Sequence, residues 1–214
     1  MPLGPALRER LGRFEQPATE AYRSWFILLD DLATTLASIA DPRTILEIGC
    51  GAGHLSGRLL ERFPEATLVG SDICESPGDR CTEHRDRAEF VRELSTDLLP
   101  ERAGSFDLVV ICDVIHHVPA AERATLVRSA VELCRPGGLV AIKDWEPTPK
   151  LANAVAVFAD KYISGDRGVS FPTRSELVEL VHQALPDADI TLEARIPPRR
   201  NNLLLVVQVP GSGD

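Results

Sequence analysis

The chain has 214 residues, 44% of them hydrophobic and 26% charged, a balance that excludes a disordered or fibrous protein and predicts one globular domain. It carries 32 acidic and 23 basic side chains, for a formal net charge of −9. This excess of carboxylates argues against a nucleic acid held over a large surface, because such binding depends on clustered cations.

The N-terminal 14 residues mix acidic and basic side chains and contain no apolar run resembling a signal sequence. Apolar runs such as 203–207 are far shorter than the roughly 20 residues of a membrane span. Five cysteines, an odd number at scattered positions, do not form a pattern of paired spacings. We therefore expect a soluble, cytoplasmic protein that does not bind membranes.

The first predicted element is an amphipathic helix over residues 18–39, with Tyr22, Trp25, Phe26 and Leu29 on one side. It could pack on a sheet or cover a cleft. Short β-rich runs then alternate with helical stripes. Strands are predicted at 45–48, 67–70, 89–92, 108–111, 139–143, 190–194 and 203–209, and helices at 55–63, 121–134 and 174–185. Several strands are apolar on both faces, as in a sheet between two helical layers, which indicates an α/β fold.

Two polar segments interrupt this alternation. Residues 74–87 are read as a loop or a short polar helix, and a zinc site there from Cys74, Cys81 and His84 is rejected for its non-standard spacing. Residues 197–202 are too short for a crossover, so the last two strands must be antiparallel. The arginines of 195–200 are assigned to a solvated hairpin tip, with a local binding patch as the alternative.

An additional helix is predicted over 150–163, after the fifth strand, where a simple crossover would not require one. It would cover a ligand pocket, with Trp145, Phe158 and Tyr162 as walls and Asp144 as a polar contact. Ordinary core packing is an equal alternative for the three aromatic side chains. The expected organisation is one domain over 1–214, divided into an N-terminal helical cover (1–43), a core (44–144), a lid insert (145–172) and a last helix with the hairpin (173–214).

The sharpest motif is a glycine loop between the first strand and its helix, where Gly49, Gly51 and Gly53 alternate. Glycines let the backbone turn tightly and let a ligand approach it closely. Asp72 follows the second strand, where a carboxylate can accept hydrogen bonds from two ribose hydroxyls. A purely structural turn is the alternative for the glycines alone. The spacing is neither the dinucleotide pattern nor a phosphate loop, so the pair predicts a nucleoside pocket.

Residues 47–53 (EIGCGAG) resemble the first motif of the class I S-adenosylmethionine-dependent methyltransferases. The segments 106–110 (FDLVV), 113–118 (DVIHHV) and 133–139 (LCRPGGL) resemble that family's later motifs in the same order. The resemblance implies a Rossmann-like, doubly wound sheet of seven strands, mostly parallel with an antiparallel C-terminal strand. It also implies S-adenosylmethionine as the cofactor. Since the one candidate zinc site is rejected for its spacing, no metal ion is predicted.

By this resemblance Gly49, Gly51 and the neighbouring backbone hold the methionine part, Asp72 the ribose, and Glu47 the amino group. An acidic residue after the third strand usually meets the adenine, and Asp97 is chosen, with Ser95 and Thr96 close behind. The polar character of 74–87 departs from the family's apolar helix and weakens the adenine wall at Ile73. The implied cofactor-binding residues are Glu47, Gly49, Cys50, Gly51, Asp72, Ile73, Asp97 and Cys112.

Candidates for acting on the acceptor follow the fourth and fifth strands, at the edge where open α/β sheets bind ligands. A phenol or amine must lose a proton, which a histidine or a carboxylate can accept. His117 is ranked as structural before catalytic, and His116 is undecided. Asp113 contacts the acceptor or caps the next turn. Asp144 completes the candidates.

The predicted activity is methyl transfer to an oxygen or nitrogen of a small molecule, possibly a product of specialised metabolism, with a homodimer left open. A repurposed or non-catalytic cofactor-binding protein is one alternative, because its cofactor motifs would look the same. A nicotinamide oxidoreductase is the other, and both the glycine spacing and the reversed strand argue against it.

Overall fold

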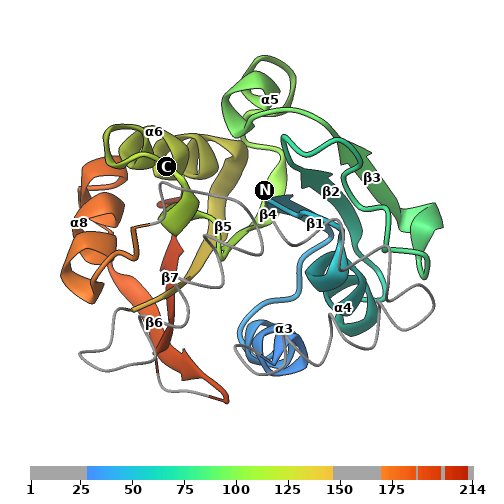
Figure 1. Ribbon diagram of the computed structural model, residues 1–214, viewed down its shortest axis with the longest axis horizontal. Helices are drawn as coiled ribbons and strands as arrows, with labels where there is room; N and C mark the ends of the chain where they lie inside the picture. Colours follow the sequence, from blue (N-terminus) through green and yellow to red (C-terminus); the bar gives the residue numbers. More distant parts are fainter. Residues whose placement is uncertain (1–27, 147–169, 187, 199–200, 212–214) are drawn as a thin grey trace, which may run out of the picture.

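The computed structural model describes residues 28–146, 170–186, 188–198 and 201–211. In this part of the chain seven strands form one sheet in the order β3-β2-β1-β4-β5-β7-β6 (Figure 1). Neighbouring strands from β3 to β5 are parallel, and β7 runs antiparallel to both β5 and β6. The predicted α/β class, seven-stranded sheet and reversed C-terminal strand are confirmed.

The strands lie close to their predicted positions because each one is rich in β-branched and other apolar residues. They are β1 (Thr44–Ile48), β2 (Thr67–Ser71), β3 (Ala88–Val91), β4 (Phe106–Cys112), β5 (Cys134–Trp145), β6 (Ile190–Ile196) and β7 (Asn202–Gln208). Residues 203–207 of β7 are buried throughout, as expected for a strand covered on both faces.

The main difference from prediction is the start of β5, which begins at Cys134 rather than at residue 139. Its pairing with β4 is irregular, since Cys134 lies opposite Phe106 and the regular register begins only at Leu108 and Leu139. Gly137 has a φ of +78° and donates its N–H to the carbonyl of Val209. Gly137, with a φ that other residues rarely adopt, therefore allows an irregular strand start immediately after the helix.

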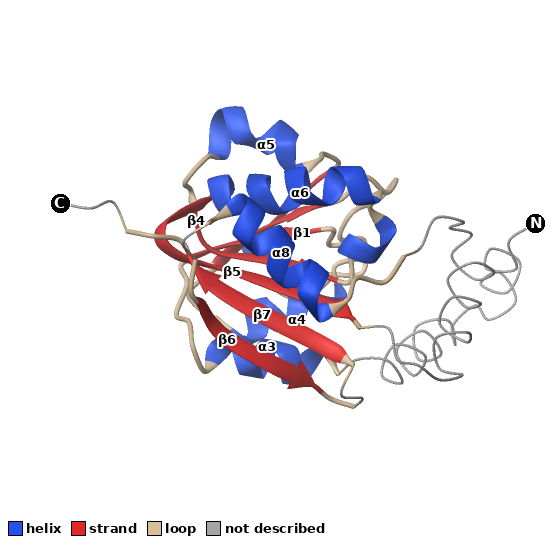
Figure 2. Cartoon of the chain, turned by 90° about the vertical axis from the view of Figure 1, so that its left-hand side faces the viewer, coloured by secondary structure: helices blue, strands red, loops and turns tan. Residues whose placement is uncertain are grey.

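Helices cover both faces of the sheet (Figure 2). On one face lie α3 (Leu29–Ala37) and α4 (His54–Arg62), and on the other lie α5 (Ser95–Arg102), α6 (Ala120–Leu133) and α8 (Arg174–Ala184). Two short 3₁₀ turns, η2 (Arg85–Arg87) and η3 (Ile115–His117), complete the described elements. Each helical layer packs an apolar cluster against the sheet, so the predicted doubly wound arrangement is confirmed.

The N-terminal helix predicted over 18–39 is described only from Leu29, and residues 18–27 lie outside the described part. Leu32 and Leu36 of α3 are fully buried in the cluster shared with α4 and the sheet. Leu29, at the start of α3, lines the main cavity. The described part of this helix therefore packs on the sheet, as one of the two predicted roles requires.

The polar segment 74–87 consists of turns that end in η2, which agrees with the predicted loop. Arg87 donates hydrogen bonds to the carbonyl oxygens of Leu60, Phe63 and Ala66 at 2.8 to 3.1 Å, and so satisfies the carboxyl end of α4. The backbone N–H of Gly78 donates to Gly51 at 2.9 Å. The segment thereby supports the glycine loop.

All five cysteines lie in the described part of the chain and are free thiols. No helix among the described residues is long and apolar enough to cross a membrane.

Candidate functional site

A cavity of about 640 Å³ lies at the carboxyl ends of the parallel strands. Its walls come from the residues that follow β1, β2, β3, β4 and β5, together with the start of α3 and the segment before α8. Open α/β sheets bind their ligands at this edge, where the loops after neighbouring strands converge. We therefore take this cavity as the functional site.

The glycine loop forms one wall of the cavity and adopts backbone conformations that other residues rarely accept. Gly49 has a φ of +75°, and a Cβ there would lie 2.2 Å from Val114 Cγ2. Gly51 has a φ of +51°, and a Cβ there would meet no atom within 4 Å. Gly49 thus lets the loop pack under Val114, and Gly51 leaves room for a ligand beside the backbone.

Asp72 lies next to this loop with its carboxylate held by two backbone groups. Its Oδ2 accepts a hydrogen bond from the N–H of Gly51 at 2.7 Å, and its Oδ1 accepts one from the N–H of Cys74 at 2.8 Å. A carboxylate oxygen has two lone pairs, so each oxygen can accept one more hydrogen bond. The predicted partner of the glycine loop is therefore oriented to receive two hydroxyl groups.

Glu47 lies below the loop, buried, and its carboxylate accepts a hydrogen bond from the Ser56 hydroxyl. Cys50 and Cys112 line the cavity as neutral thiols. Burial is the main cause that raises the pKa of both thiols, and the carboxylates of Glu47 and Asp72 raise that of Cys50 further. Burial thus disfavours the thiolate form of both cysteines.

The far end of the cavity is lined by Ile73 after β2 and by Glu93, Leu94 and Ser95 after β3. Ile73 and Leu94 are 65% and 55% exposed, unusual for large apolar side chains, and could bind an apolar ring system. Asp97 does not reach the cavity, because its carboxylate accepts the N–H of Leu94 at 3.1 Å and caps α5. The structure thus brings Ser95, the second choice, to the cavity, and not Asp97 or Thr96. The apolar Leu94, three residues after the end of β3, was the missed signal.

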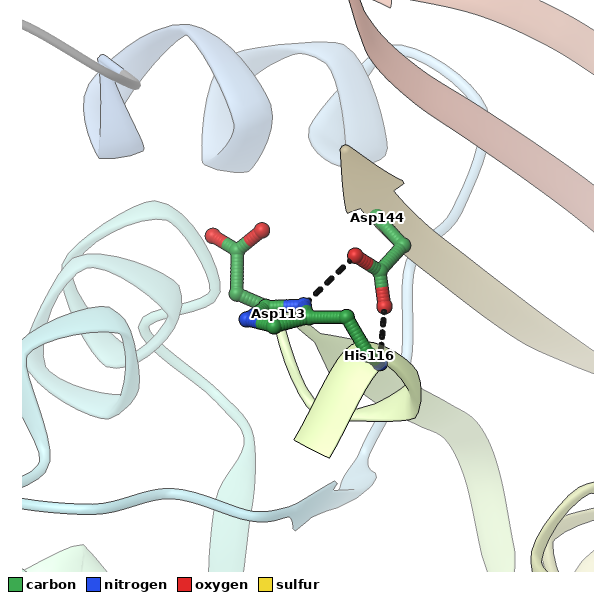
Figure 3. A group of neighbouring side chains, drawn as sticks. All are labelled: Asp113, His116 and Asp144. Carbon is green, nitrogen blue, oxygen red and sulfur yellow. Dashed lines mark hydrogen bonds and ion pairs between the residues drawn. The ribbon is translucent and has the colours of Figure 1, made fainter. Parts of the chain in front are cut away.

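His116 and Asp144 form a buried pair at the opposite end (Figure 3). Asp144 Oδ1 lies 2.7 Å from His116 Nδ1 and accepts the Trp145 N–H at 2.6 Å, and Oδ2 accepts the His116 N–H at 3.1 Å. Burial alone would raise the pKa of this carboxyl, but His116 and these hydrogen bonds hold it below its usual range. The pair is a carboxylate that orients an imidazole.

Asp113 interacts with Lys143 and not with the following turn. Lys143 Nζ donates to Asp113 Oδ1 at 2.6 Å, and the Asp113 N–H donates to the Lys143 carbonyl at 2.9 Å. Asp113 has a φ of +58°, which is rare for a non-glycine residue. The turn η3 begins without a side-chain cap, so the capping alternative for Asp113 is not what the structure shows. Lys143 lines the cavity and was absent from the predicted site.

His117, for which a structural role was ranked before a catalytic one, is exposed and lines the cavity. Its ring centroid lies 4.1 Å from that of His116. All four predicted acceptor-side residues therefore lie close together, but the carboxylate of Asp144 interacts with His116. Sequence reasoning left this choice open because the two histidines are adjacent and only the backbone turn decides which one faces Asp144.

Asp113, His116 and Asp144 offer ligand atoms within 4.8 Å of one another, the one such group among the described residues. However, Asp113 already accepts from the Lys143 ammonium, and both Asp144 oxygens accept hydrogen bonds. A metal ion would have to displace these hydrogen-bond donors. The two carboxylates therefore fit their present partners, an imidazole and a lysine, better than a metal ion.

Residues just before α8 hold His116 from the other side. The Ser170 N–H donates to the His116 carbonyl at 3.0 Å, and the Phe171 ring lies 4.9 Å from the His116 ring and 5.7 Å from the Trp145 ring. Buried Arg123 donates to the carbonyls of Val118 at 2.9 Å and Ser170 at 2.6 Å. These contacts, which the sequence did not reveal, join the loop after β4 to the segment before α8.

The predicted lid is described only at its two ends. Trp145 and Phe171 line the cavity, whereas Phe158, Tyr162 and the rest of 147–169 lie outside the described residues. At the hairpin, Arg195 forms an ion pair with Glu146 at 2.8 Å, and residues 199–200 lie outside the described part.

Comparison with known sequences relates the chain to methyltransferases. Residues 45–138 match the family model described as "Methyltransferase domain". The ubiquinone biosynthesis O-methyltransferase of Pseudomonas paraeruginosa is 30% identical over 125 residues, which cover 56% of this chain and 52% of the relative. The trans-aconitate 2-methyltransferase of Methylobacterium radiotolerans is 31% identical over 119 residues, covering 54% and 44%. The chain thus spans about half the length of these curated relatives.

Solved structures show the same fold. An O-methyltransferase family protein from Burkholderia thailandensis has a TM-score of 0.70 at 21% identity, covering 98% of this chain and 60% of that one. The 1,6-didemethyltoxoflavin-N1-methyltransferase of the same species, solved with its substrate and S-adenosylhomocysteine, has a TM-score of 0.67 at 19% identity, covering 95% and 87%.

Proposed function

We propose that the chain is a class I S-adenosylmethionine-dependent methyltransferase, which transfers a methyl group from S-adenosylmethionine to an oxygen or nitrogen of a small molecule. The observation that carries the proposal is a single cavity whose two ends differ. One end is built from the glycine loop and Asp72, and the other holds the His116–Asp144 pair.

The residues at the first end fit this cofactor. The open space beside Gly51 and the two oxygens of Asp72 suit the methionine part and a ribose. Ile73 and Leu94 offer an apolar wall for the adenine, and Glu47 supplies negative charge for the amino group. When bound, S-adenosylmethionine supplies a methyl group on a cationic sulfur, and the carbon–sulfur bond breaks toward sulfur as a lone pair of the acceptor forms the new bond.

At the second end the chain orients the acceptor and removes its proton. Asp144 binds Nδ1 of His116, so a proton from the acceptor would pass to Nε2, and the carboxylate would stabilise the resulting imidazolium. Asp113 lies beside this pair and can accept a hydrogen bond from the acceptor. Trp145 and Phe171 form an apolar wall that limits access of water.

A small acceptor suits a cavity of about 640 Å³ and a chain with net charge −9. The names of the relatives also support a small-molecule acceptor, since one relative is named for ubiquinone biosynthesis and the other for trans-aconitate. We also propose a role in specialised metabolism, a cytoplasmic location that suits the five free thiols, and, as a state to be measured, a homodimer.

Calorimetry tests the proposal directly. The purified chain is titrated with S-adenosylhomocysteine and, separately, with NADH. We expect binding of the first and none of the second. Asp72→Ala should weaken the first at least about tenfold, because a hydrogen bond to a charged group contributes about 1.5 to 3 kcal/mol. Asp79→Ala, an exposed aspartate nearby, is the matched control. Binding of NADH alone would refute the proposal and support the oxidoreductase alternative.

A further inference from the structure

Lys143 is a charged residue where the fold would favour an apolar one. It lies on the inner strand β5, next to Cys112 of β4 and Leu204 of β7, and is 1% exposed. Strand alternation places it on the same face as Ala141, in the apolar layer covered by α3 and α4. Burying an ammonium group costs several kcal/mol unless its charge and its donors are matched.

The protein matches this ammonium group only in part. Its charge is paired with Asp113, 2.6 Å away, whose side chain is 34% exposed while that of Lys143 is 2% exposed. An ammonium group has three N–H donors. Asp113 Oδ1 accepts one, and the described residues provide no acceptor for the other two. Since Lys143 lines the cavity, these donors can be met by a molecule bound there.

The number of lone pairs on the methyl-accepting atom decides whether it can accept a hydrogen bond from Lys143 and still react. A hydroxyl oxygen that has lost its proton carries three lone pairs, so it can accept a hydrogen bond from Lys143 and still attack a methyl group. A neutral amine has one lone pair, which cannot do both. Methylation also makes an amine nitrogen positive, which a neighbouring ammonium disfavours, whereas negative charge on oxygen is stabilised. Lys143 therefore favours oxygen over nitrogen.

We propose, building on the function proposed above, that Lys143 binds the reacting oxygen of the acceptor and that the acceptor presents an acidic hydroxyl group, a phenol or an enol. The hydroxyl proton passes to His116, and the negative charge left on oxygen lies beside Lys143 until the new carbon–oxygen bond forms. The positions agree, because Asp113, which binds Lys143, has a carboxylate oxygen within 4.8 Å of a ring nitrogen of His116 (Figure 3).

The probe for this proposal is 4-nitrophenol, whose phenolate absorbs visible light and whose neutral form does not. The full chain, saturated with S-adenosylhomocysteine, is mixed with the probe and titrated with acid and base. Other titratable groups also face the probe and could change its pKa, so variants separate their effects from that of Lys143. The groups that line the same cavity are Asp113, His116, His117, Glu122, Cys112 and Glu47, and Asp144 lies behind His116. We expect the bound probe to have a pKa about one below its value in solution, a tenfold preference for the phenolate.

Lys143→Met should bind S-adenosylhomocysteine normally but lose this preference for the phenolate. Asp113→Asn should retain or increase it, because a competing negative charge is removed while Lys143 stays. Arg128→Met, which removes an exposed positive charge on α6 outside the cavity, should behave like the wild-type chain. 4-Nitroaniline, of the same shape with an amine, should bind at least about tenfold more weakly than 4-nitrophenol.

The proposal would be overturned by no binding of 4-nitrophenol, by a bound pKa at or above the solution value, or by an unchanged preference in Lys143→Met. Binding of 4-nitrobenzoate through Lys143 without binding of 4-nitrophenol would also overturn it, and would assign the anionic oxygen to a carboxylate. Failure to bind S-adenosylhomocysteine would instead contradict the proposed function, so the two can be told apart.

Discussion

Asp144 accepts hydrogen bonds from both the ring and the backbone of His116, Oδ1 from Nδ1 at 2.7 Å and Oδ2 from the N–H at 3.1 Å. One carboxylate thus fixes the turn after β4 and the orientation of its imidazole at the same time. Asp144→Asn would keep the shape but replace one acceptor oxygen with a donor group. The imidazole would then lose the partner that stabilises its charged form.

For Asp144→Asn we expect methyl transfer to a hydroxyl acceptor to slow by about 100-fold or more, the usual contribution of general base catalysis. Affinity for S-adenosylhomocysteine should stay within about twofold, since Asp144 is absent from the cavity lining. The measurement is S-adenosylhomocysteine formed at saturating acceptor, with the exposed Asp189→Asn as control. A turnover within about threefold of wild type would show that Asp144 has only a structural role.

Arg123 should support catalysis without contacting any ligand. Arg123 is 6% exposed, and its guanidinium joins Val118, after η3, to Ser170, whose N–H donates to the His116 carbonyl. Arg123→Ala should lower stability by about 2 kcal/mol, since two hydrogen bonds from a buried charged group are lost. Turnover per folded molecule should fall more than cofactor affinity does. Urea unfolding and calorimetry measure the two effects, with the exposed Arg128→Ala on the same helix as the control. Equal losses of turnover and affinity would contradict a positioning role.

Asp107 predicts how stability depends on pH. Burial tends to raise the pKa of its carboxyl, but the N–H groups of Arg43 and Thr44, at 2.7 and 2.8 Å, and the Arg135 guanidinium together lower it below the ordinary 3.8. A carboxylate whose pKa is lower in the folded chain stabilises the fold above pH 3.8, and this contribution disappears as the pH falls through the folded value.

Asp107→Asn should therefore cost about 2 kcal/mol at pH 7 and progressively less below pH 4. Urea unfolding of both proteins across this range measures the difference. A difference that stayed constant from pH 7 to the acid limit would show that the charge of Asp107 does not contribute.

Much of the fold was predictable because the buried strands are rich in apolar residues and so can be recognised from composition alone. Each apolar run became a strand, and the turn at 197–202 correctly required one reversed strand. The glycine loop and Asp72 were also predictable, because φ values above zero and a carboxylate after the next strand leave clear traces in sequence.

The remaining site residues depend on contacts between distant segments. In the sequence, Lys143 looks like an interruption in an apolar strand, but in the structure it is paired with Asp113 at 2.6 Å. Arg123 looks like an ordinary charge on a helix, but in the structure it donates a hydrogen bond to Ser170. Asp97 was chosen by residue type, but local helix capping uses its carboxylate. Periodicity and spacing do not encode such pairings.

Gly51 offers a test that separates stability from binding. Both Gly51 and Gly104 have positive φ values, +51° and +64°, and a Cβ at either position would meet no atom within 4 Å. Alanine at each should thus cost a similar conformational energy, about 1 kcal/mol. Only the Cβ at position 51 lies beside the proposed cofactor, since Gly51 lines the cavity and Gly104 does not. We expect both variants to unfold at nearly the same urea concentration, and Gly51→Ala alone to bind S-adenosylhomocysteine at least about tenfold more weakly by calorimetry, because the added methyl group would occupy the space that a ligand needs beside the backbone. Equal affinities in the two variants would show that the backbone at Gly51 is not in contact with the cofactor.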